Sequence, residues 1–109
     1  MSQQELFPYL IDQDFIDEYK FAQNELKLLN KAKQQFVKVI QDYKILKRRY
    51  ISVYKDKLIS EIEYFGAIKK TDLNINECEE WLAEINFSLE EWNKRFSLLR
   101  SSMIKKMRI

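Results

Sequence analysis

The chain of 109 residues contains a single proline, Pro8, and a single glycine, Gly66. The long segment between them therefore holds none of the residues that break a helix. Because β architectures need glycine and proline in their tight turns, this scarcity excludes most of them. The sequence predicts an all-α protein.

Apolar residues recur along this segment at alternating spacings of four and three. Only Lys33 and Lys47 interrupt the series, and we expect their stems to be buried while their ammonium groups reach water. Sustained spacing of this kind predicts one long helix with a coiled-coil-like seam. The series consists of Phe15, Tyr19, Ala22, Leu26, Leu29, Phe36, Ile40, Tyr43, Tyr50 and Tyr54.

Capping residues set the expected bounds of this first helix. Asp12 is the expected N-cap, and Asp14 marks an alternative start. Gly66 is the expected C-terminal cap, because glycine most readily adopts the left-handed conformation that ends helices. We therefore predict a helix over about 13–65.

A second helix is expected over about 76–106, after a connection at 69–76 in which Thr71, Asn74 or Asn76 supplies the N-cap. Residues 88–91 have the pattern of a capping box, but the apolar phase continues through them, which favours one uninterrupted helix with Ser88 on its surface. The two helices would form a long antiparallel hairpin. The second series consists of Cys78, Leu82, Ile85, Leu89, Trp92, Phe96, Leu99 and Met103.

We expect residues 1–109 to form a single helical domain, with 1–11 as an apolar N-terminal arm and 104–109 as a basic C-terminal tail. Pro8 disfavours a helical conformation at the preceding residue, so the arm is not expected to lengthen the helix. Phe7 and Tyr9 on this arm are candidates for docking onto another protein. The alternative is that the arm folds back onto its own bundle.

A continuous helix over 13–65 would be about 80 Å long, more than a compact monomer of this size can bury. Between residues 32 and 54 its apolar side chains cover an arc of about 160°, which is wider than a two-stranded seam requires. The second helix provides one neighbour. We predict that self-association into a homo-oligomeric bundle provides another, with folding back of residues 1–30 as the alternative.

Charge falls into four blocks of alternating sign. Residues 1–25 contain six acids and one base, and residues 26–57 contain ten bases and two acids. Residues 58–92 contain nine acids and two bases, and residues 93–109 contain six bases and no acid. A fold at about residue 70 would place basic residues beside basic ones. The repulsion between these basic residues would be reduced by the acidic N-terminal stretch, by a second chain or by an external polyanion.

The function indicated by these features is a non-catalytic protein–protein interaction module, such as an assembly subunit, adaptor or inhibitor that presents helical faces to a partner. The alternative is a small nucleic-acid-associated protein that binds phosphates through a basic helical surface. Candidate partner-binding residues are Phe7, Tyr9, Tyr43, Lys47, Arg48, Tyr50 and Tyr54. Candidate residues for the nucleic-acid alternative are Lys44, Lys47, Arg48, Arg49, Lys55, Lys105, Lys106 and Arg108.

Catalysis is not expected, because the chain has no histidine and no glycine-rich phosphate loop, and neither a metal site nor a cofactor is predicted. No secretory signal and no membrane-spanning run is visible, and membrane-surface binding is a lesser expectation. Cys78 has no partner for an intramolecular disulfide. A cytoplasmic location is therefore expected.

Overall fold

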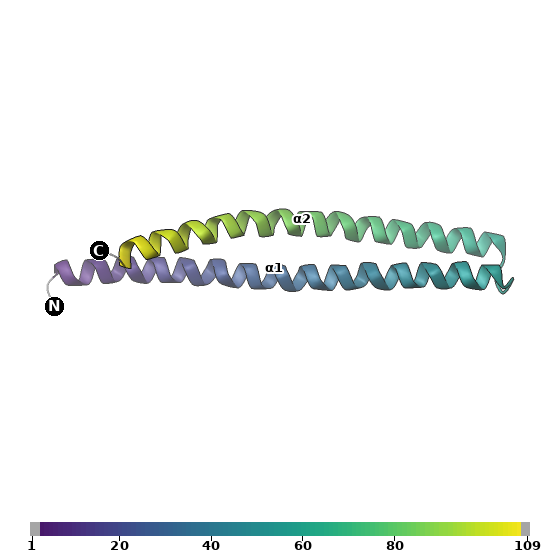
Figure 1. The fold of residues 1–109 in the computed structure, drawn as a ribbon, viewed down its shortest axis with the longest axis horizontal. Helices are drawn as coiled ribbons and strands as arrows, with labels where there is room; N and C mark the ends of the chain where they lie inside the picture. Colours follow the sequence, from purple (N-terminus) through teal and green to yellow (C-terminus); the bar gives the residue numbers. More distant parts are fainter. Residues whose placement is uncertain (1–2, 108–109) are drawn as a thin grey trace. The chain divides into compact units, whose positions relative to one another are not determined.

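The computed structural model describes the backbone of residues 3–107 and the side chains of residues 13–105. Two helices, α1 (Gln3–Lys55) and α2 (Glu61–Met107), account for nearly all of this part, which contains no strand (Figure 1). The predicted all-α antiparallel helical hairpin is confirmed. The positions at which its helices begin and end differ from the prediction.

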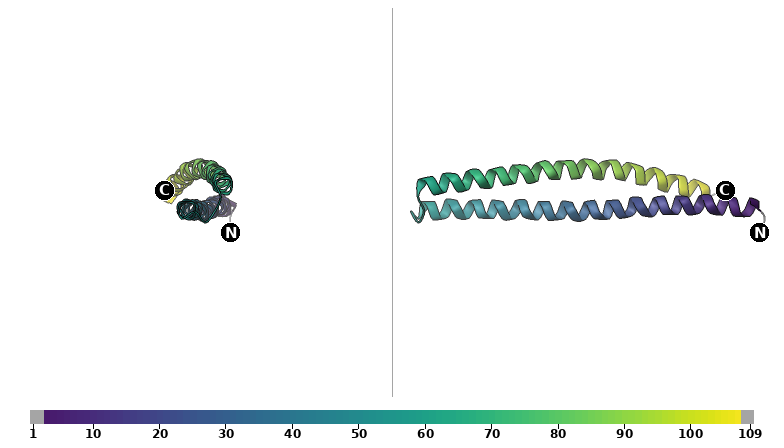
Figure 2. Two further views of the ribbon diagram at one scale, coloured as in Figure 1. Left: turned by 90° about the vertical axis from the view of Figure 1, so that its right-hand side faces the viewer. Right: turned by 180° about the vertical axis from the view of Figure 1, so that it is seen from behind.

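The chain divides into two compact units, each built from one segment of α1 and one of α2. Unit 1 comprises Met1–Asn30 and Phe87–Ile109, and unit 2 comprises Lys31–Asn86. Within each unit the α1 and α2 segments lie side by side and run in opposite directions (Figures 1 and 2). Only unit 2 contains the turn between the helices.

This turn lies at residues 56–60, and the predicted connection at 69–76 was wrong. Lys57 adopts a positive φ of 60°. Its amide donates to the carbonyl of Tyr54 at 3.0 Å, and the amide of Leu58 donates to the carbonyl of Val53 at 2.9 Å. These bonds form a Schellman motif, in which a left-handed residue ends the helix and satisfies its last carbonyl groups.

Replacing Lys57 with glycine is expected to raise the free energy of unfolding by about 0.5–1 kcal/mol, because glycine removes the Cβ clash of the left-handed conformation. Urea denaturation at one protein concentration would measure the change. Asp56→Gly is the matched control, because Asp56 does not have a positive φ. Equal effects of the two substitutions would contradict the assignment of the turn.

Ser60 is the N-cap of α2. Its Oγ accepts a hydrogen bond from the amide of Glu63 at 3.1 Å, and its carbonyl accepts one from the amide of Tyr64 at 2.9 Å. Glu61 and Glu63 place negative charge in the first turn, where it interacts favourably with the helix dipole. The sequence Ser60-Glu61-Ile62-Glu63 has the capping-box pattern, so the start of α2 carries a recognisable sequence signal.

Gly66 lies inside α2 and does not end a helix, so its predicted role as a C-terminal cap was wrong. Its φ is not positive, and a Cβ added there would meet no atom within 4 Å. Thr71, a candidate N-cap, is also inside α2. It is 4% exposed and its hydroxyl donates to the carbonyl of Ala67 at 2.7 Å.

We expect Gly66→Ala to stabilise the protein by about 1 kcal/mol, because alanine costs less backbone entropy than glycine in a helix interior. Thermal or urea denaturation of the two proteins would provide the comparison. A glycine that capped a helix in the left-handed conformation would give a loss of stability instead.

The backbone of α1 begins at Gln3, so the expected start near residue 13 was wrong and residues 3–11 extend the helix. Pro8 lies within the first two turns of this helix. At the other end, α2 continues through Ser88 to Met107. This confirms the prediction that the second apolar series belongs to one helix.

The seam between the helices contains the predicted apolar series. All ten residues of the first series and all eight of the second are buried or half-buried, with Ala22, Ile40, Leu89 and Leu99 among the most buried. Of the two interrupting lysines, Lys47 is half-buried and Lys33 is exposed. Ala32, next to Lys33, is half-buried.

Candidate interaction surface

The helices of unit 2 carry opposite charges along the seam. Residues 31–55 of α1 contain eight basic residues and one acidic residue, whereas residues 61–86 of α2 contain seven acidic and two basic residues. With the turn at 56–60, the basic segment lies beside the acidic one. The expected juxtaposition of like charges, which depended on a fold at about residue 70, was wrong.

Unit 1 shows the reverse arrangement. Residues 13–30 of α1 contain four acidic and two basic residues, and residues 87–105 of α2 contain four basic and two acidic residues. Each unit therefore brings an acidic segment beside a basic one. The acidic segment that lies beside the basic segment 31–55 belongs to α2 of the same chain.

One ion pair crosses between the helices of unit 2. The Nζ of Lys47 lies 2.8 Å from Oδ1 of Asp72, and the two side chains are 37% and 45% exposed. At this exposure such a pair contributes about 1 kcal/mol or less. The pair also shows that Lys47 and Asp72 lie on the same side of the seam.

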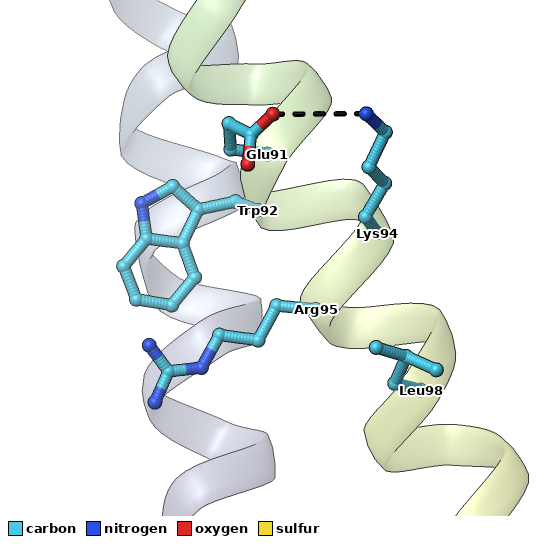
Figure 3. Close-up of a pocket in the computed structure, with 5 residues that line it drawn as sticks. All are labelled: Glu91, Trp92, Lys94, Arg95 and Leu98. Carbon is cyan, nitrogen blue, oxygen red and sulfur yellow. Dashed lines mark ion pairs between the residues drawn. The ribbon is translucent and has the colours of Figure 1, made fainter.

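An aromatic and charged cluster joins the helices of unit 1. The guanidinium of Arg95 lies 5.3 Å from the ring centre of Trp92 and 3.2 Å from Oε1 of Glu18 on α1. The ring of Trp92 in turn lies 5.8 Å from that of Phe21. Figure 3 shows Trp92 and Arg95 extending toward α1.

The same region contains a surface pocket lined by α2 alone (Figure 3). Lys94 pairs with Glu91 at 3.7 Å, and Arg95 is held by Glu18 and Trp92. All lining residues except Trp92 are exposed, so the pocket offers open surface. Its lining residues are Glu91, Trp92, Lys94, Arg95 and Leu98.

The three tyrosines predicted at a partner interface lie in the seam of unit 2. Tyr43, Tyr50 and Tyr54 are half-buried, and the ring of Tyr54 stacks on that of Tyr64 with centres 4.1 Å apart and planes 10° apart. Their main contacts are therefore within the hairpin. Their role toward another protein stays a prediction that concerns only their exposed edges.

The structure describes the side chains of six predicted basic residues, five on α1 of unit 2 and one on α2 of unit 1. Lys44, Arg48, Arg49 and Lys55 are exposed on α1 of unit 2, where Nε of Arg48 lies 3.5 Å from the carbonyl oxygen of Lys44. Lys105 is exposed in unit 1. The side chains of Phe7, Tyr9, Lys106 and Arg108 lie outside those that the structure describes.

A stripe of uncharged side chains runs along one side of the seam in unit 2. Four lie seven residues apart on α1, and three lie seven residues apart on α2. We call this set the uncharged flank. It consists of Ala32, Val39, Leu46, Val53, Ala67, Asn74 and Trp81.

The Lys47–Asp72 pair shows that the two halves of this flank lie on the same side. Trp81 is nine residues from Asp72, which places it about 180° away around α2. Leu46 is about 100° from Lys47 and points away from the ion pair on α1. Because the two helices are antiparallel, Trp81 on α2 and Leu46 on α1 lie on the same side of the seam, opposite the ion pair.

The opposite side of the seam carries charge. We call this set the charged flank, and it combines apolar residues with Lys44 on α1 and with Asp72 and Glu79 on α2. Asp72 of this flank pairs with Lys47 of the seam. The two flanks of unit 2 therefore differ in chemistry. The apolar members of the charged flank are Val37, Ile51 and Phe65.

Over the described side chains, no cluster of three or more acidic, cysteine or histidine residues is arranged to hold a metal ion. Within the described helices, no stretch is both long enough and apolar enough to cross a membrane. No family model, curated protein or solved structure matches this chain.

Proposed function

We propose that this protein is a non-catalytic interaction module, an assembly subunit, adaptor or inhibitor, that binds another protein through apolar helical faces. The observation that carries this proposal is the amount of apolar side-chain surface left uncovered. Large contiguous apolar patches on soluble proteins mark interaction sites.

Among the described residues, more large apolar side chains are exposed than buried. Only five apolar side chains are buried among those described, whereas fifteen large apolar side chains are more than a third exposed. The exposed set includes aromatic residues, which supply much of the binding energy at protein interfaces. Its members are Ile16, Phe21, Leu28, Val37, Val39, Ile45, Leu46, Leu58, Ile62, Phe65, Leu73, Trp81, Phe87, Leu98 and Ile104.

Affinity capture with three forms of the chain tests the proposal. The original chain is compared with Leu46→Glu/Trp81→Lys on the uncharged flank and with Ile45→Glu/Leu73→Lys on outward faces. We expect the original and the outward-face variant to retain the same protein, and the flank variant to lose it. Retention of no protein above a blank support, or of the same protein by all three forms, contradicts the proposal.

The second candidate function is nucleic-acid association, supported by the exposed side chains of Arg48, Arg49 and Lys55 on α1. Binding to phosphates through these residues would weaken steeply with salt. Arg48→Glu/Arg49→Glu would then abolish retention on a DNA or RNA column at low salt. Unchanged retention of this variant contradicts the candidate.

A cytoplasmic location belongs to the same set of proposals, because Cys78 is free in the structure.

A further inference from the structure

The uncharged flank of unit 2 is an incomplete packing surface. Val39 is 39% exposed, Leu46 is 36% exposed and Trp81 is 52% exposed, although each lies next to the buried seam. The remaining four residues of the flank are half-buried. A further layer of helix over this flank would cover all seven residues.

The absence of charge restricts what can cover the flank. A covering surface must itself be apolar at the points of contact, because an unpaired charge buried there would be strongly disfavoured. The same flank on a second copy of the chain satisfies this condition along its full length. Two such flanks facing each other bury no charge from either side.

The sizes of the side chains also suit a contact between two copies. The flank contains one large ring, Trp81, and small residues at Ala32, Ala67 and Asn74. In a two-fold contact each copy presents the same patch, which allows the ring of one copy to lie over smaller side chains of the other. Large residues opposite small ones allow helices to pack closely.

Net charge does not oppose the approach of two copies. Residues 31–86 contain eleven basic and nine acidic residues, so unit 2 is close to neutral. Long-range repulsion between two such units is weak.

We infer that the uncharged flank binds the same flank of a second copy of this chain. This inference rests on the proposed function, because it names the partner of one apolar face. Val39, Leu46 and Trp81 are the residues that supply most of the contact. The charged flank stays open at the opposite side of unit 2.

Sedimentation velocity of the purified chain over a hundredfold range of concentration tests the inference. We expect the original chain and Ile45→Glu/Leu73→Lys to reach the mass of a dimer with equal dissociation constants. Leu46→Glu/Trp81→Lys is expected to raise the dissociation constant by about 100-fold or more, because each dimer loses four apolar side chains and gains four charges at the contact. Circular dichroism checks that all three forms stay helical.

Val39→Ala/Trp81→Ala provides a second variant that introduces no charge, and we expect it to weaken the dimer as well. Two results would overturn the inference: an original chain that is monomeric at every concentration, or flank variants that dimerise as tightly as the outward-face variant. Because only purified chain is present, neither result decides whether a different protein is retained in the capture experiment. Failure of the inference and failure of the proposed function are thus distinguishable.

Discussion

Replacing Ile40 with alanine is expected to lower the free energy of unfolding by about 2–4 kcal/mol. Ile40 is 7% exposed in the seam of unit 2, and few other apolar side chains there are as buried. Removing its outer carbons loses transfer free energy and leaves a cavity between the two helices. Urea denaturation at one protein concentration would measure the loss, since association adds to apparent stability.

Ile45→Ala is the matched control for this prediction. It makes the same chemical change five residues further along α1, at a side chain that is 43% exposed on the outward face. We expect a change of less than about 1 kcal/mol, because little apolar surface is lost from the core and alanine favours helix. Similar losses at the two positions would contradict the assignment of the seam.

Replacing Glu90 with proline is expected to cost about 3 kcal/mol or more. Glu90 is exposed, lies in the middle of α2 and forms an ion pair with Lys94 at 3.9 Å. Proline there removes one backbone hydrogen bond, and its ring clashes with the preceding turn. Loss of helicity and of unfolding free energy would be followed by circular dichroism during urea denaturation.

Glu90→Ala separates the loss of the carboxylate from the loss of the backbone bond, and we expect it to change stability by less than about 0.5 kcal/mol. The experiment also tests whether α2 restarts at Ser88. If a new helix began there, position 90 would lie in the first turn, where proline is tolerated. A small effect of Glu90→Pro would therefore contradict the continuous helix.

The seam could be predicted from the sequence because helical periodicity records which residues face inward. Positions such as Tyr19 and Phe96 keep the four–three spacing, and their rings meet with centres 4.7 Å apart. The pattern also predicted that the apolar arc on α1 is wider than one neighbour covers. Val39 and Leu46 lie in the exposed part of that arc.

The turn could not be located by searching for glycine. A lysine, Lys57, occupies the left-handed position, although glycine is the usual residue there. The prediction instead placed the end of the first helix at Gly66, because a glycine inside a helix and a capping glycine cannot be distinguished by sequence alone. The capping box that begins at Ser60 was the signal that could have placed the turn correctly.

The position of the turn determines which charged residues face each other across the seam. A shift from about residue 70 to residues 56–60 changes every pairing across the seam, so that opposite charges meet. Periodicity alone cannot detect this, because the apolar pattern on each helix is the same in either register. The uncharged flank could not be predicted from the sequence for a related reason. The register of the two helices must be known before the residues that share one side of the seam can be identified.

The chain turns at 56–60 and so brings the basic segment of α1 beside the acidic segment of α2. Nuclear Overhauser effects between the aromatic protons of Tyr54 and Tyr64 measure this most directly, because the two residues lie on either side of the turn with their rings stacked. We expect strong cross-peaks between the two rings. Their absence, together with contacts from Tyr54 to residues beyond 80, would show a turn near residue 70 and contradict the turn at 56–60.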